Sequence, residues 1–193
     1  MIANNRGEDE SFPSSRPRRL VIRKPGESVQ LQQLGISDAT ALFNLVDADR
    51  DHFVPFGSAF PDEVHSINDA MTNIARPHLG RIRFGIWDDG QIRGETDLMY
   101  RATGLAEVGY WIGGEHTRKR YATRSQQLLA SWAFEAGRVN LLYANIDVNN
   151  VASRGVVESA GFVQVELSPE EQLDDTDENI VQYVRSKNTS SSE

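Results

Sequence analysis

A cluster of cationic residues surrounds the expected start of a helix, directly after an apolar strand. The cluster consists of Arg118, Lys119, Arg120 and Arg124, and the helix is expected to begin at Tyr121, Ala122 and Thr123. The first backbone N–H groups of a helix have no partner within the helix, and together with the helix dipole they favour an anion. Guanidinium groups beside them would add charge-assisted hydrogen bonds to phosphate oxygens. The pattern predicts a phosphate site, but a basic helix start is equally consistent with a solvated face.

A second polar pair, Asn150 and Ser153, lies where an apolar strand ends and a short helix is expected to begin. The spacing of three residues places both side chains in the first turn. On this evidence Asn150 caps the helix and Ser153 satisfies a local backbone group. A chemical role for either residue follows only from the family resemblance described below.

Several carboxylates are candidates for a general base or for attracting a cationic ligand. Glu107 begins the strand that leads into the cationic loop, and Glu95 and Asp97 lie on the neighbouring strand. Glu170 and Glu171 belong to an acidic run between the last two expected strands. A solvated, charged loop is the alternative interpretation of that run.

Composition narrows the class of protein. The chain has 193 residues, 39% of them hydrophobic, no cysteine and a net charge of −8, which indicates one globular domain without disulfides or a cysteine acyl-enzyme. The acidic balance argues against nucleic-acid binding and suits a cationic substrate. The four histidines show no metal-ligand spacing. The absence of a long apolar run or leader indicates a cytoplasmic protein without a membrane segment.

Hydrophobic periodicity predicts alternating strands and helices between two polar tails, residues 1–18 and 186–193, which are expected to be disordered. The domain is therefore assigned to residues 19–185. Strands are expected over 29–34, 82–87, 92–99, 105–112, 141–148, 162–165 and 180–184. In the first helix the buried face is expected to contain Ala39, Leu42, Phe43 and Val46, and in the second Val64, Ile67, Met71 and Ile74. Trp111 and Trp132 fall on apolar faces and are expected in the core. A mixed sheet flanked by helices, of the α+β class, buries all these faces most simply.

Five sequence blocks, in order, carry a resemblance to a known family. They are Gly109-Tyr-Trp-Ile-Gly-Gly-Glu-His-Thr, Tyr121-Ala-Thr, Trp132-Ala-Phe-Glu, Asn150-Val-Ala-Ser and Glu158-Ser-Ala-Gly-Phe. Together they resemble the GNAT superfamily of N-acetyltransferases, in particular the ribosomal-protein N-terminal acetyltransferases of the RimJ and RimL type. The resemblance runs from Gly94 to Val163 without a visible gap and extends more loosely to residues 50–56. It implies a central, mostly antiparallel seven-stranded sheet with a splay between the fourth and fifth strands, flanked by about four helices.

The same resemblance implies acetyl-CoA as the acyl donor, no metal, and an amine-bearing acceptor such as a protein N-terminus or a small amine. The acetyl group would reach a primary amine by direct attack in a ternary complex, and a homodimer is common in the family. Backbone N–H groups near Tyr110, Trp111 and Ile112 would bind the thioester carbonyl and stabilise the oxyanion. Asn150 would contact the pantetheine, and Ser153 would lie beside the sulfur and assist the departing thiolate.

The acceptor side and the general base are also suggested by the resemblance. Phe53 and Phe56 precede the helix that forms the acceptor-side wall in such folds, and they are candidate substrate contacts. Glu107 and Glu170 are candidate bases, and Glu171 is a candidate for binding the cationic acceptor. Some relatives carry a base candidate in the region of Glu170.

Arg118 and Arg120 depart from the family pattern, which has glycines at both positions. Glycine permits positive φ and a close approach of the backbone to the pyrophosphate, whereas a non-glycine residue at positive φ costs roughly 1 kcal/mol or more. The arginines could occupy the space of the pyrophosphate, or they could turn outward and bind phosphates. Two alternatives to an acetyltransferase follow: a degenerate, non-catalytic GNAT domain that acts as a binding or regulatory module, and an enzyme whose donor carries a carboxylated acyl group such as succinyl.

Overall fold

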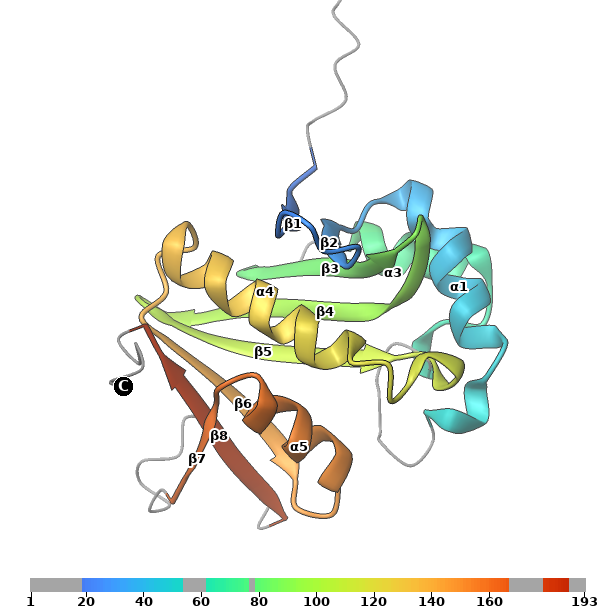
Figure 1. The fold of residues 1–193 in the computed structure, drawn as a ribbon. Coiled ribbons are helices and arrows are strands. Elements are labelled where there is room, and N and C mark those ends of the chain that lie inside the picture. Colours follow the sequence, from blue (N-terminus) through green and yellow to red (C-terminus); the bar gives the residue numbers. More distant parts are fainter. Residues whose placement is uncertain (1–18, 54–61, 77–78, 167–178, 188–193) are drawn as a thin grey trace, which may run out of the picture.

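One mixed sheet organises the chain (Figure 1). The computed structural model describes residues 19–53, 62–76, 79–166 and 179–187. In them the strand order is β1-β2-β3-β4-β5-β6-β8-β7. The strands are β1 Val21–Arg23, β2 Gln30–Gln33, β3 Arg81–Asp88, β4 Gln91–Ala102, β5 Leu105–Ile112, β6 Leu141–Asp147, β7 Val163–Val165 and β8 Ile180–Ser186. Neighbouring strands are antiparallel except β5 and β6, which are parallel. The predicted α+β class with a mostly antiparallel sheet is confirmed.

The described residues contain eight strands, so the predicted number of seven is wrong by one. The additional strand, β1, pairs with β2 through Ile22 and Leu31, and Ile22 is its one buried residue. Three residues are too short to show an alternating pattern, which is why the sequence did not predict it. At the other end β8 includes Ser186, which the sequence analysis assigned to the C-terminal tail.

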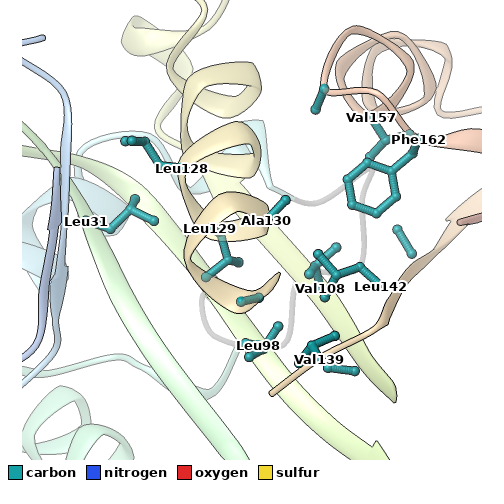
Figure 2. Packing of buried hydrophobic residues seen from close by; sticks show 14 of the residues in the cluster. Leu31, Leu98, Val108, Leu128, Leu129, Ala130, Val139, Leu142, Val157 and Phe162 are labelled. Atoms are coloured by element: carbon teal, nitrogen blue, oxygen red, sulfur yellow. The ribbon is translucent and has the colours of Figure 1, made fainter. Parts of the chain in front are cut away.

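Four helices cover the two faces of the sheet in the described part of the chain. They are α1 Ala39–Asp47, α3 Ile67–Ala75, α4 Tyr121–Glu135 and α5 Val151–Ser159, and 3-10 helices cover Ile36–Asp38, Arg50–His52 and Gly114–His116. One core lies under α4 and α5, where Leu129 and Val157 meet the strand residues Leu98, Val108 and Leu142 (Figure 2). Among the described residues, no helix has the length and apolar character needed to cross a membrane.

A second, smaller core lies under α1 and α3 on the opposite face. Leu42 and Val46 of α1 pack there with Phe53 and Val64, and Trp111 of β5 lies against them. As expected, Trp132 packs on the first core, with its ring edge-to-face with Phe84 at 5.8 Å.

The buried face of α3 differs from the predicted stripe. Ser66 caps the helix by accepting a hydrogen bond from the N–H of Asp69 at 3.1 Å, so the helix begins only at Ile67. Its buried residues are Ala70 and Asn73, whereas Ile67 and Met71 are exposed. The prediction is confirmed for Val64 and Ile74, which pack in the α1–α3 core. It was wrong for Ile67 and Met71, because Asn73 is held inside by Arg83, which donates to its Oδ1 at 2.5 Å. A polar contact between distant segments therefore set the rotation of this helix.

Candidate active site

The parallel pair β5–β6 opens into a splay. Its three register pairs join residues 105–107 to 141–143 and end at Glu107 and Tyr143, after which the two strands diverge (Figure 1). Strands β5 and β6 are the fourth and fifth of the seven predicted strands, so the splay lies where the resemblance implied. Beyond Glu107 the β6 side of β5 has no strand partner among the described residues, which frees backbone groups there.

A cavity of about 420 Å³ lies at this opening. Of the predicted cofactor-binding residues, those that line it are Tyr110, Trp111, Ile112, Arg118, Arg120, Tyr121, Ala122, Thr123, Asn150 and Ser153; the predicted acceptor contact Phe53 also does. Lys119 is not in the lining. The sequence analysis did not single out His52, His116, Thr117, Ala152 and Val156, which complete it. Helical spacing from Asn150 places Ala152 and Val156 on the face next to Ser153, so that periodicity could have identified them.

The loop before α4 keeps a conformation that glycine usually adopts. Arg118 and Arg120 have φ of 59° and 65°, and Arg120 is the N-cap without a side-chain cap. The first intrahelical bond runs from the N–H of Arg124 to the carbonyl of Arg120 at 3.0 Å. The N–H groups of Tyr121, Ala122 and Thr123 are therefore the orphan donors of the helix start, and these three residues line the cavity.

The cationic side chains of the loop are not neutralised by neighbouring carboxylates. Arg118, Lys119 and Arg120 are exposed and form no salt bridge with any residue of the described ranges. Positive charge and orphan N–H donors thus occur at one end of the cavity, an arrangement suited to phosphate.

The turn between β3 and β4 holds the start of α4. The Tyr121 hydroxyl donates to the Asp88 carboxylate at 2.7 Å, which raises the pKa of Tyr121, and hydrogen bonds from Ser28 and then Tyr121 lower the pKa of Asp88. The guanidinium of Arg93 lies 5.9 Å from the centre of the Tyr121 ring. Burial, and then the charges of Arg93 and Lys119, lower the pKa of His116.

Tyr110 and Ser153 meet across the splay. The Tyr110 hydroxyl lies 2.7 Å from Ser153 Oγ and 3.1 Å from the Ser153 carbonyl oxygen. Burial raises the pKa of Tyr110 to about 12, so the phenol stays protonated at neutral pH. Asn150 caps α5, because its Oδ1 accepts from the Ser153 N–H at 3.0 Å. Asn150 both caps α5 and lines the cavity, so the two interpretations of this residue are compatible.

Two aromatic rings meet on the side of the cavity where the sequence analysis expected the acceptor. The Phe53 and Trp111 rings meet edge-to-face, with centroids 5.3 Å apart at 89°. Phe53 is 3% exposed, and Trp111 packs on the α1–α3 core, as the core prediction required. Phe56, Glu170 and Glu171 lie outside the described residues.

Three candidate bases of the sequence analysis do not line the cavity. Glu107 forms an ion pair with Arg101 at the paired end of the splay. Glu95 accepts two hydrogen bonds from Arg83, at 2.5 and 2.9 Å. Asp97 accepts one from Arg81 at 2.6 Å. The structure does not bring Glu107 together with Ser153.

Comparison with known proteins agrees with this geometry. A family model described as "Acetyltransferase (GNAT) domain" matches residues 28–163. The chain is 24% identical over 148 residues to "Probable N-acetyltransferase YjcK" of Bacillus subtilis (strain 168), covering 71% of this chain and 81% of that protein.

Two solved structures have the same fold. The microcin C7 self-immunity acetyltransferase MccE, in complex with acetyl-CoA and AMP, aligns with a TM-score of 0.72 at 20% identity, over 83% of this chain and 93% of that one. RimL, a ribosomal L7/L12 alpha-N-protein acetyltransferase in complex with coenzyme A, aligns with a TM-score of 0.72 at 18% identity, over 86% and 97%. The family match covers well over half of the sequence, and the chain belongs to the GNAT family of acetyltransferases.

Proposed function

We propose that this protein transfers an acetyl group from acetyl-CoA to a primary amine by direct attack in a ternary complex. The observation that carries the proposal is the single cavity lined both by the start of α4 and by the Tyr110–Ser153 pair at the splay. The first can bind phosphates, and the second can stabilise a leaving thiolate. MccE in complex with acetyl-CoA and RimL in complex with coenzyme A support this choice of donor.

The loop before α4 fits the phosphates of coenzyme A. Arg118 and Arg120 retain the left-handed backbone, so the orphan N–H groups of Tyr121 to Thr123 keep the orientation that a glycine loop provides. Their guanidinium groups add charge without a competing carboxylate in the described chain. The arginines thus supplement the phosphate site by charge-assisted hydrogen bonds.

The protein stabilises two developing charges in this reaction. Backbone N–H groups of β5 around Tyr110 to Ile112, next to the strand edge that β6 leaves, stabilise the oxyanion. As the amine attacks, the new C–N bond forms, the C–S bond breaks, and the proton lost by the amine ends on the sulfur. Ser153, itself hydrogen-bonded to Tyr110, donates a hydrogen bond to the developing thiolate.

Ser153 is better suited to stabilise charge than to give up a proton. The Tyr110 pKa of about 12 lies well above that of an ordinary thiol, about 8.5. Neither hydroxyl therefore protonates a thiolate completely at equilibrium. The proton that neutralises the thiolate therefore comes from the amine.

Two classes of acceptor are compatible with the names of the structural neighbours. RimL is named for a protein N-terminus, and MccE for self-immunity to microcin C7. Both a protein N-terminus and a small amine therefore enter the test. The net charge of −8 favours a cationic acceptor in either case.

The first experiment is calorimetric titration of the full chain with acetyl-CoA and with coenzyme A, followed by mass spectrometry of peptides and small amines incubated with the acetyl donor. Binding in the micromolar range, about −8 kcal/mol, and an acetylated amine support the proposal. Failure of acetyl-CoA and coenzyme A to bind, with binding restored in the double variant Arg118→Gly and Arg120→Gly, favours a non-catalytic GNAT domain. Stronger binding of succinyl-CoA than of acetyl-CoA favours a carboxylated acyl donor.

A further inference from the structure

The face of the sheet under α1 and α3 carries charged side chains beside the splay. Side chains alternate between the two faces along a strand. Trp111 of β5 therefore points to this face, a side chain at position 109 would do so too, and Tyr110 points to the other face. In register, Asp97 of β4 lies opposite Gly109, and Glu95 lies opposite Trp111. Asp97 therefore lies beside Gly109, one residue before Tyr110, on the face of the sheet that also holds Phe53.

Gly109 lets the Asp97 carboxylate reach over β5. A Cβ added at Gly109 would lie 2.7 Å from Asp97 Oδ1, closer than real side chains tolerate. The carboxylate therefore occupies the space that any other residue at position 109 would fill. Oδ1 therefore lies over β5, whose other edge is the one that β6 has left and where the proposed function places the acetyl carbonyl.

Asp97 also has capacity for a ligand that the neighbouring carboxylates lack. Glu95 is 3% exposed and has both oxygens bound by Arg83. Glu107 lies at the paired end of the splay with Arg101. In Asp97, Oδ2 accepts from Arg81 at 2.6 Å, and no described residue donates a hydrogen bond to Oδ1.

We propose that Asp97 binds the ammonium group of the acceptor through Oδ1, across the gap at Gly109. The inference rests on the proposed function and names its acceptor subsite. The ligand class is a primary ammonium, on a protein N-terminus or on a small molecule, with Phe53 and Trp111 as the apolar wall beside it. An ammonium carries three N–H donors, so it can bind Oδ1 with one of them. It then loses one proton to solvent, and the neutral amine attacks the carbonyl.

The test compares each amine with its acetylated form, which has the same shape elsewhere but no ammonium. The full chain, saturated with coenzyme A, is titrated with a hexapeptide beginning with alanine and with its Nα-acetyl form. A second arm uses benzylamine and N-acetylbenzylamine. The variants are Asp97→Asn, Gly109→Ala and Glu27→Gln, the last removing the carboxylate of the exposed Lys24–Glu27 pair as a matched control.

The expected result is a preference of about tenfold or more for the free amine in at least one arm, lost in Asp97→Asn and Gly109→Ala and retained in Glu27→Gln. The Gly109→Ala variant retains both charges, those of Arg81 and Asp97, so it decides the question if Asp97→Asn does not fold. Equal affinity for both forms in the unchanged protein, or a preference that survives in both site variants, overturns the inference. Coenzyme A binding is measured separately: if it is absent the proposed function fails, and the amine comparison without coenzyme A still decides the role of Asp97.

Discussion

The Tyr110 hydroxyl lies 2.7 Å from Ser153 Oγ, although 43 residues separate the two in sequence. The contact joins β5 to the first turn of α5 across the splay, and both residues line the cavity. When Tyr110 donates to Ser153 Oγ rather than to the Ser153 carbonyl, the serine hydrogen is free to point into the cavity. The contact thus couples the orientation of the Ser153 hydroxyl to Tyr110.

Removal of the Tyr110 hydroxyl should slow the chemical step without weakening donor binding. Tyr110→Phe is expected to lower kcat by up to about tenfold, since a hydrogen bond between neutral groups contributes about 0.5–1.5 kcal/mol. Steady-state kinetics and acetyl-CoA titration check this. Ser153→Ala should have a similar effect, and the double variant should lose less than the product of the two because they act as a unit. Multiplicative losses would show that the two hydroxyls act independently.

The two loop arginines should contribute to donor affinity through their charge. Arg118→Ala and Arg120→Ala are each expected to raise the Kd of acetyl-CoA several-fold at low salt, with a smaller effect at high salt because exposed charges are screened. Calorimetry at two ionic strengths measures this. Unchanged affinity in both variants would mean that the guanidinium groups do not contact phosphate.

Arg138, with φ of 57°, provides a matched control for backbone strain. It lies after the C-terminal end of α4 and does not line the cavity. Arg138→Gly and Arg120→Gly both remove a non-glycine residue from positive φ, worth roughly 1 kcal/mol, partly offset by the greater freedom of glycine in the unfolded chain. Both should change the free energy of unfolding similarly, but only Arg120→Gly should weaken acetyl-CoA binding.

The buried Arg83–Glu95 pair should matter for stability far more than an exposed pair. Glu95→Gln leaves the guanidinium of Arg83, whose side chain is 9% exposed, without its counter-charge, and a loss of about 3–5 kcal/mol is expected. Glu27→Gln at the exposed Lys24–Glu27 pair should cost less than about 1 kcal/mol. Urea unfolding compares the two variants. Equal losses of unfolding free energy in the two variants would show that burial does not strengthen the Arg83–Glu95 pair.

His116 should make stability depend on pH. Its pKa in the folded protein is lowered from the ordinary value of 6.5. At a pH between the folded-state pKa and the unfolded-state pKa, the unfolded chain therefore binds a proton that the folded chain does not. Stability is therefore expected to fall as pH decreases below about 6.5, and less so in His116→Gln. Thermal unfolding at several pH values tests this. A phosphate ligand should raise the His116 pKa, which an NMR titration with and without coenzyme A would detect.

Local features of this protein were readable from its sequence. Asn150 caps α5 through a bond to Ser153 three residues away, and α4 begins at Tyr121 after a cationic loop. Such features depend on hydrogen bonds and periodicities within one or two turns, so neighbouring residues determine them. The splay also followed, because five ordered blocks carried the family resemblance.

Other features were decided by the tertiary structure. Strand register sets Asp97 opposite Gly109, and a contact between α3 and β3 turns Asn73 inward. The pairing of Tyr110 with Ser153 and the separation of Glu107 from that pair depend on where β5 and β6 part. These relationships join residues that are distant in sequence, and a shift of one position in register would move each side chain to the other face. The sequence alone determined which chemistry was available, and the packing of the sheet decided which side chains meet to perform it.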